Sequence, residues 1–138
     1  MILLDTSGLL AAIDASQNEH EQARAVLDAA PGPMLLSPFV LAELDYLLAV
    51  RVGERARISL LAEVERDVYA LQSISGRDVT RARAVIENHA ALGISLADAS
   101  IVVLAERHAT ADVLTLDQRH FRVLTASGKP FRLLPADA

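Results

Sequence analysis

The sequence contains no cysteine and no tryptophan, and only 4% of its 138 residues are aromatic. The absence of cysteine excludes disulfide bonds, thiolate metal sites and a cysteine nucleophile, and it agrees with a reducing compartment. The first residues include no basic segment, and the apolar run at the N-terminus ends at Asp5. No stretch approaches the roughly 18 uncharged apolar residues that a membrane-spanning helix needs. We therefore expect a cytoplasmic protein with no membrane contact.

The chain also lacks an excess of basic residues. It has 18 acidic residues against 13 lysines and arginines, a formal net charge of −5. Because surfaces that bind nucleic acids are usually basic, this balance argues against extended, sequence-independent binding of nucleic acid. It does not exclude an enzyme with an acidic site for divalent cations, since two such ions would offset most of the negative charge.

Strand-like and helix-like segments alternate along the chain. Short apolar runs predict strands at residues 2–5, 34–36, 69–73, 113–116 and 131–134. Longer segments with helical periodicity lie at residues 7–14, 19–30, 38–52, 54–67 and 76–91 and around Asp98. This alternation predicts an α/β fold, a three-layer α/β/α sandwich with a mostly parallel central sheet. With 138 residues, 52% of them hydrophobic, the chain is long enough for one domain, residues 1–138, and has no room for a second.

Two aspartates directly follow predicted strands. Asp5 ends the run MILLD, and Asp117 ends the run DVLTLD. In open α/β sheets, ligands bind beyond the carboxyl ends of the strands. We therefore expect Asp5 and Asp117 to face one crevice.

Two further acids lie within apolar helical segments. Asp98 belongs to a segment that is apolar nearly all round, which is typical of a buried helix. No basic residue shares the helical face of Glu43, which has as neighbours Phe39, Val40 and Leu47. An ionised carboxylate in such surroundings is costly unless a cation pairs with it. Because Mg²⁺ and Mn²⁺ prefer carboxylate oxygens as ligands, the four acids together predict a site for divalent metal ions.

Structural roles are the alternative for each acid. Asp5 and Asp117 each precede a short helical pattern, so both could cap the N-terminus of a helix. Asp98 follows Ser95 by three residues, which is the spacing of a capping box. Glu43 lies in mid-helix, where it caps nothing, but an ion pair with another helix is an alternative. The coincidence of all four acids favours the metal site over four separate structural roles.

Four segments of the sequence resemble the motifs of a known family. The segments are LLDTSGLLA, SPFVLAELDYLL, ISLADASIVVLAERH and TLDQRHF, and each contains one of the four acids. In order and spacing they resemble the motifs of PIN-domain ribonucleases, and in particular those of the VapC-type toxins of bacterial toxin–antitoxin systems. The resemblance covers nearly the whole chain, and no acidic position of the motifs is missing.

This resemblance implies a metal-dependent endoribonuclease whose cofactor is Mg²⁺ or Mn²⁺. It implies a substrate among the structured RNAs of the translation machinery, tRNA or ribosomal RNA, a cognate VapB-type antitoxin that neutralises the enzyme, and a homodimer. The catalytic and metal-binding residues that it implies are Asp5, Glu43, Asp98 and Asp117, with supporting hydroxyl groups from Thr6 or Ser7 and from Thr115.

The histidines and their basic neighbours add weaker indications. The four histidines show no H-E-x-x-H spacing, so a zinc site of that kind is not expected. Arg119 and His120 follow Asp117 and are candidates for contact with an RNA phosphate, with a simple surface position as the alternative.

Three other classes of protein match parts of the pattern. A receiver-type phosphoacceptor domain requires an adjacent acidic pair after the first strand, where this chain has Asp5 and Thr6. A haloacid-dehalogenase-like phosphatase requires Asp-x-Asp, and Ser7 occupies the second position. A catalytically silent PIN-like module would bind a partner without cutting RNA, and the presence of all four acids argues against it.

Overall fold

Five parallel strands form the central sheet of the computed structural model, which describes residues 1–138. The order of the strands across the sheet is β3-β2-β1-β4-β7, and every neighbouring pair is parallel. Their bounds are Ile2–Leu4 (β1), Met34–Leu36 (β2), Ala70–Leu71 (β3), Asp112–Leu114 (β4) and Arg132–Leu134 (β7). The parallel sheet that the sequence predicts is confirmed.

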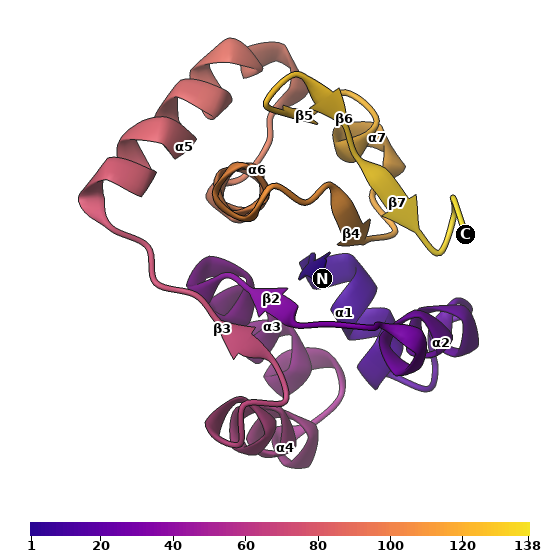
Figure 1. Cartoon of the computed structure of the whole chain (residues 1–138). Helices are drawn as coiled ribbons and strands as arrows, with labels where there is room; N and C mark the ends of the chain where they lie inside the picture. The colour runs from indigo at the N-terminus through magenta and orange to yellow at the C-terminus, as the bar shows by residue number, and fades with distance from the viewer.

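Helices cover both faces of this sheet. Figure 1 shows α1, α2 and α4 on one side of the strands and α5, α6 and α7 on the other. Helix α3 packs against both α1 and α6. The helices are Thr6–Ile13 (α1), His20–Ala29 (α2), Pro38–Arg51 (α3), Glu54–Glu65 (α4), Gly76–Asn88 (α5), Leu96–His108 (α6) and Gln118–Phe121 (α7), with a 3-10 turn at Ala90–Leu92. The three-layer α/β/α arrangement is therefore as the sequence predicts, and no helix is both long and apolar enough to cross a membrane.

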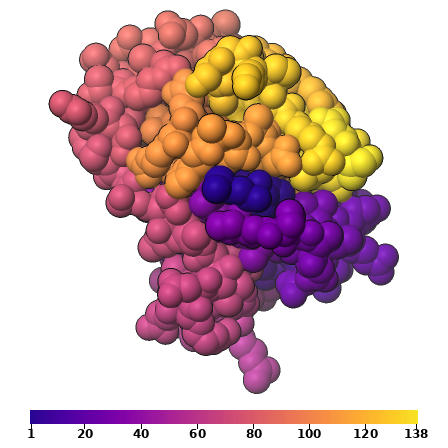
Figure 2. Space-filling model, in the orientation of Figure 1, coloured from indigo at the N-terminus to yellow at the C-terminus, as the bar shows by residue number.

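The order of the strands creates a switch point beside β1. The chain runs outward from β1 through β2 to β3, and it then returns to the opposite side of β1 with β4. Figure 2 shows the indigo N-terminal residues between purple and orange segments, as this order requires. The connections on the two sides of β1 leave in opposite directions, which opens a crevice at the carboxyl ends of β1 and β4.

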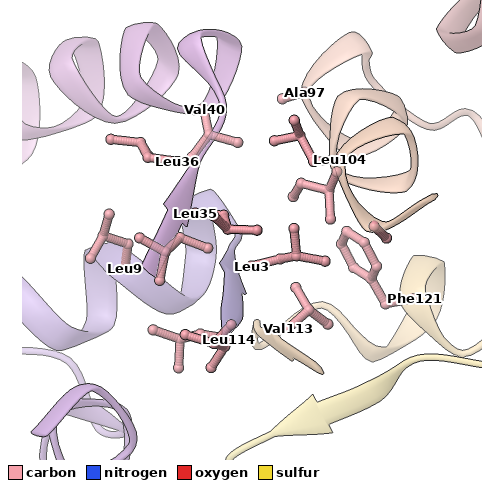
Figure 3. Close-up of a cluster of buried hydrophobic side chains, with 14 of the residues drawn as sticks. Leu3, Leu9, Leu35, Leu36, Val40, Ala97, Leu104, Val113, Leu114 and Phe121 are labelled. Carbon is pink, nitrogen blue, oxygen red and sulfur yellow. The ribbon is translucent and has the colours of Figure 1, made fainter. Parts of the chain in front are cut away.

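The core explains why such short strands are stable. Leu3 and Leu4 of β1, like Val113 and Leu114 of β4, have no exposed surface. Figure 3 shows Leu3 between side chains of the β2–α3 region on one side and those of α6 and α7 on the other. Strands that are buried on both faces consist of continuous apolar residues, as expected for a parallel sheet covered by helices.

A small hairpin lies outside the predicted elements. Thr125–Ala126 (β5) pairs antiparallel with Lys129–Pro130 (β6). Ser127 and Gly128 between them both have positive φ angles, 50° and 76°, as a tight hairpin turn requires. Strands of two residues carry no detectable alternation, so the hydrophobic pattern could not predict them. Strand β3 covers only Ala70–Leu71 of the predicted residues 69–73. Strand β1 ends at Leu4, so Asp5 directly follows it.

Gly8 in α1 lies directly against the end of β4. A Cβ atom at this position would overlap the backbone carbonyl group of Leu114. We expect Gly8→Ala to lower the free energy of unfolding by about 1–3 kcal/mol, the usual cost of overpacking. Urea denaturation checks this, with Gly76→Ala as the control, because a Cβ atom at Gly76 would meet nothing within 4 Å. Equal stability of Gly8→Ala and the wild type would contradict the close approach of α1 to β4.

Candidate metal centre

All four predicted acids line one cavity of about 300 Å³ at the carboxyl ends of β1 and β4. Three hollows of about 680, 600 and 310 Å³ lie elsewhere, and none of them contains a cluster of carboxylates. The residues that line the acidic cavity are Asp5, Thr6, Ser7, Leu10, Glu43, Leu47, Arg51, Ser95, Asp98, Asp117 and His120. Segments that are far apart in the sequence therefore meet at the switch point of the sheet.

Asp5 is a buried residue of this cavity and is held by two hydroxyl groups. Its Oδ2 atom accepts hydrogen bonds from Ser7 Oγ at 2.8 Å and from Thr115 Oγ1 at 2.6 Å. Burial raises the pKa of Asp5 to about 6, although both hydroxyl groups act in the opposite direction. Asp5 occupies the N-cap position of α1, but its side chain makes no capping hydrogen bond there, so capping does not explain its carboxylate.

The same two hydroxyl groups join the ends of β1 and β4. Ser7 Oγ accepts a hydrogen bond from the backbone N–H of Leu116 at 3.0 Å. Thr115 Oγ1 accepts one from the backbone N–H of Asp117 at 2.9 Å. Thr115 therefore contacts Asp5 through its proton and the backbone of Asp117 through its lone pair, which sets the relative positions of the two aspartates.

Asp98 has a structural role and also lines the cavity. Ser95 and Asp98 form a capping box at the start of α6, in which Asp98 Oδ2 accepts from the Ser95 N–H at 3.1 Å. Asp98 is only 7% exposed. Burial raises its pKa and the charge of Asp117 adds to this, against the lowering effects of Ser95 and His120. The capping box that the spacing indicates is present, but it does not account for the second acid beside it.

Asp117 caps α7 with one carboxylate oxygen and faces His120 with the other. Its Oδ1 atom accepts a hydrogen bond from the backbone N–H of His120 at 3.0 Å. Its Oδ2 atom lies 2.8 Å from His120 Nδ1. The capping alternative is therefore right for Asp117, and one oxygen remains free to bind a ligand.

The environment of Glu43 differs from the expected one. The buried face of α3 consists of Val40, Leu44 and Leu48, and Glu43 lies beside that face at the exposed rim of the cavity. The expectation of an acid within an apolar surface is thus wrong for Glu43. The reason is that a residue beside an apolar stripe has apolar neighbours at helical spacing even when it is not part of the stripe. Only the packing of α3 against other helices decides which side chains are buried.

His120 is the member of the cluster whose position the sequence did not predict. Its Nδ1 atom lies 3.4 Å from Asp98 Oδ2 as well as 2.8 Å from Asp117 Oδ2. Arg119, by contrast, is exposed and does not line the cavity. The sequence did contain one indication that His120 lies near Asp117. The two residues are three positions apart, and residues three apart share a helical face.

The composition of the cavity fits a divalent cation. The ion pairs that involve arginine include none of Asp5, Glu43, Asp98 and Asp117. Two of these acids are buried, and buried carboxylates are costly without a compensating charge. Thr6 Oγ1 is also buried and has no hydrogen-bond partner in the protein. Carboxylate oxygens are the ligands that Mg²⁺ and Mn²⁺ take, so these residues could hold such an ion.

The fold and the cavity together define the class: a doubly wound α/β domain with a cavity lined by four acids at its switch point. The family model of the PIN domain matches residues 2–125. Ribonuclease VapC26 of Mycobacterium tuberculosis is 36% identical over 135 residues, which cover 97% of this chain and 100% of that protein. The chain therefore belongs to the PIN-domain family and is of the VapC ribonuclease type.

Solved structures show the same fold. The crystal structure of M. tuberculosis VapC20, described as a sarcin–ricin loop cleaving toxin, has a TM-score of 0.79 and 23% identity, over 85% of this chain and 90% of that one. VapBC2 of Rickettsia felis, bound to a DNA fragment from its promoter, has a TM-score of 0.68 and 18% identity, over 96% and 98% of the two chains. These structures support the fold, and the family model together with the 36% identity to VapC26 confirms the predicted resemblance to VapC-type PIN domains.

Proposed function

We propose that this protein is a metal-dependent endoribonuclease toxin of the cytoplasm that cleaves structured RNA of the translation machinery, tRNA or ribosomal RNA. One observation carries the proposal: four acids meet in one cavity without an ion pair to lysine or arginine, in a chain similar to Ribonuclease VapC26. The description of VapC20 as a sarcin–ricin loop cleaving toxin supports a structured target.

The metal-binding residues in this proposal are Asp5, Asp98 and Asp117, with Glu43 binding directly or through water. Mg²⁺ or Mn²⁺ bound there would supply an activated water and would stabilise the charge on the leaving oxygen. Asp5 and Asp98 contribute fixed carboxylates, because hydrogen bonds from Ser7, Thr115 and Ser95 hold them.

Two exposed side chains at the rim take the remaining roles. Glu43 is proposed to orient the attacking water and accept its proton, since it is the acid of the cavity that solvent reaches most freely. Arg51, which is also exposed and lines the cavity, is proposed to bind a phosphate of the RNA. The net charge of the protein is negative. Local basic side chains such as Arg51 therefore have to provide the attraction for RNA.

Thr115→Val tests the hydroxyl network. Removing this hydroxyl takes a hydrogen bond from Asp5 and leaves the N–H of Asp117 without its partner. We expect the affinity for Mn²⁺ to fall about 10- to 100-fold, as is usual when a group that orients metal ligands is lost. Isothermal titration calorimetry measures this, and Thr115→Ser, which keeps the hydroxyl, serves as the control. Unchanged affinity in Thr115→Val would show that the hydroxyl does not position the aspartates.

The proposed partners are a cognate VapB-type antitoxin that neutralises the enzyme and a second copy of the chain. Toxin–antitoxin complexes among the structures with this fold support the antitoxin. The α3–α4 hairpin carries five exposed apolar residues, which we call the hairpin face: Tyr46, Val50, Val52, Ile58 and Leu61. Exposed apolar side chains in a group mark surfaces that bind other proteins. We assign the hairpin face to the homodimer.

Val50→Asp tests this assignment. Val50 is 62% exposed, so the substitution should leave the stability of the monomer nearly unchanged while a charge enters the proposed dimer contact. We expect the molar mass in solution, measured by light scattering after gel filtration, to shift from dimer to monomer. Val123→Asp is the control, because Val123 is similarly exposed on another part of the surface. A dimer that survives Val50→Asp would place the contact elsewhere.

The activity itself is tested with total cellular RNA. Purified protein is incubated with RNA and Mg²⁺, Mn²⁺ or EDTA, and new RNA ends are mapped by sequencing. Cleavage at few sites, lost with EDTA, would establish the endoribonuclease and identify its substrate. Folded, antitoxin-free protein that cleaves nothing under these conditions would contradict the proposal and favour a PIN-like module that binds without cutting.

A further inference from the structure

Granting the metal-dependent activity proposed above, we infer that His120 is itself a metal ligand, and that its nitrogen makes the centre prefer divalent transition-metal ions to Mg²⁺. The three ligands of this subsite are Asp98, Asp117 and His120. One ligand atom from each lies within 4.8 Å of the others. The nitrogen atom distinguishes this subsite from one made of carboxylates alone.

The spacing of the three atoms suits neighbouring ligands of one ion. His120 Nδ1 lies 2.8 Å from Asp117 Oδ2 and 3.4 Å from Asp98 Oδ2. An octahedral ion with metal–ligand bonds of about 2.1 Å places adjacent ligand atoms roughly 3 Å apart. The two distances from His120 lie on either side of that value, and the atoms of Asp98 and Asp117 lie within 4.8 Å of each other, so one ion could contact all three groups.

The close contact between His120 and Asp117 is not an ordinary hydrogen bond. Nδ1 is buried, and despite its distance of 2.8 Å from Asp117 Oδ2 it has no hydrogen-bond partner with acceptable geometry. A buried polar atom without a partner costs about 1–3 kcal/mol. A cation bound beside the nitrogen and the carboxylates would remove that cost, because it would give the buried nitrogen a partner.

A second buried polar atom in the same cavity also lacks a partner. Thr6 is 5% exposed, its Oγ1 atom makes no hydrogen bond within the protein, and the residue lines the cavity beside the acids. A hydrated ion in the cavity would supply a partner for this hydroxyl. The two unpartnered atoms come from different elements, α1 and α7, which is expected if the cavity is arranged around a ligand.

His120 is held in place before any ion binds. It belongs to the single turn α7, whose start is capped by Asp117. The next residue, Phe121, is fully buried and packs edge-to-face against Phe131 at a centroid distance of 5.5 Å. The backbone carbonyl of His120 accepts hydrogen bonds from Val123 and Leu124, both at 3.0 Å. The imidazole therefore needs little reorganisation to bind an ion, as a metal ligand should.

The chemistry of imidazole sets the selectivity. Carboxylate and water ligands suit Mg²⁺ and also Mn²⁺, whereas imidazole nitrogen suits the later first-row ions such as Fe²⁺, Ni²⁺ and Zn²⁺, and affinity for such sites rises along the series that begins with Mn²⁺. Replacing one oxygen of an all-oxygen set by nitrogen therefore weakens the binding of Mg²⁺ relative to that of Mn²⁺ and the ions that follow it in the series. The centre should discriminate against Mg²⁺ even where Mg²⁺ is in excess.

Mn²⁺ is the probe that tests this inference without RNA. Electron spin echo spectroscopy of the Mn²⁺-loaded wild-type protein is expected to show coupling to an imidazole nitrogen, and ¹⁵N-labelling of histidine should change that signal. His120→Asn places an amide near the position of Nδ1, and it is expected to abolish the coupling. Competition titrations should show that the preference for Mn²⁺ over Mg²⁺ falls at least about tenfold in this variant.

His108→Asn is the matched control. His108 is also half-buried, but its Nε2 atom contacts Gln72 at 2.8 Å, and it does not line the cavity. This variant should retain both the nitrogen coupling and the preference for Mn²⁺. Absence of nitrogen coupling in the wild type, or an equal loss of Mn²⁺ and Mg²⁺ affinity in His120→Asn, would overturn the inference. Nitrogen coupling in a protein that cleaves no RNA would support His120 as a metal ligand and refute the proposed activity. Metal-dependent cleavage without nitrogen coupling would support the activity and refute His120 as a ligand.

Discussion

Asp98→Asn is expected to reduce metal-dependent RNA cleavage by more than about a hundredfold, since even the loss of groups that only orient metal ligands costs 10- to 100-fold. Asp98 supplies a buried carboxylate to the cavity, close to both Asp117 and His120. Asparagine has nearly the same shape but no negative charge. The variant should therefore fold, bind Mn²⁺ weakly and leave RNA intact, as measured by circular dichroism, calorimetry and mapping of RNA ends.

Asp78→Asn is the control for the structural role of Asp98. Asp78 is the corresponding acid of a second capping box, formed with Ser75 at the start of α5, and it does not line the cavity. Asp78→Asn loses the carboxylate of its capping box and an ion pair with Arg107 at 2.7 Å, so it should lose about 0.5–2 kcal/mol of stability. Only Asp98→Asn should lose activity. If Asp98→Asn cleaves RNA as well as the wild type, the assignment of the metal centre is wrong.

Removing divalent metal ions is expected to make the stability of the protein fall as the pH rises from about 4 to about 6. The pKa of Asp5 is raised from its ordinary value of 3.8 to about 6, mainly by burial. Between these two values the folded state binds more protons than the unfolded state, so stability decreases with increasing pH and is constant above the upper value. The difference corresponds to about 3 kcal/mol at most, at 1.36 kcal/mol per pH unit. Asp98 acts in the same direction, because burial raises its pKa too.

Asp5→Asn tests this linkage directly. Asparagine offers the same acceptor oxygen to Ser7 and Thr115 but carries no charge, so at pH 8 without metal the variant should be more stable than the wild type by about 1–3 kcal/mol. At pH 4 the difference should vanish. Saturating Mn²⁺ should stabilise the wild type more than the variant, because the variant lacks one of the two buried carboxylates of the cavity. Thermal unfolding at several pH values, with and without EDTA, measures all three effects.

The exposed acid Asp28 provides the control for the pH experiment. Its side chain is 65% exposed on α2, so Asp28→Asn should reproduce the pH profile of the wild type. A profile of the metal-free wild type that stays flat between pH 4 and pH 6 would mean that Asp5 is not destabilised by its burial. The cavity would then not need a cation to be stable.

Most of the fold was accessible from local patterns in the sequence. The runs of apolar residues before Asp5 and before Asp117 predicted two strands, and both strands are present in the sheet. Pro38 after Ser37 predicted the start of α3, where Ser37 Oγ accepts a hydrogen bond from the N–H of Phe39. These features are local, since a few neighbouring residues decide them.

The environment of individual side chains was not accessible in the same way. Glu43 and Asp98 both lie in apolar helical segments, yet Asp98 is buried and Glu43 is exposed. The difference depends on which face of α3 packs against α1 and α6. Gly8 gave no signal of its own, although its lack of a side chain allows α1 to approach Leu114.

The sequence by itself determined that four acids follow strands or lie within apolar helices, and that strands and helices alternate. Hydrophobic periodicity and chain length decide these features without reference to distant residues. Only the tertiary structure decided that β4 lies beside β1, so that Asp5 and Asp117 share one crevice and His120 joins them. The physical reason is that a metal centre requires ligand atoms within a few ångströms of each other, and strand order brings together residues that more than a hundred positions separate.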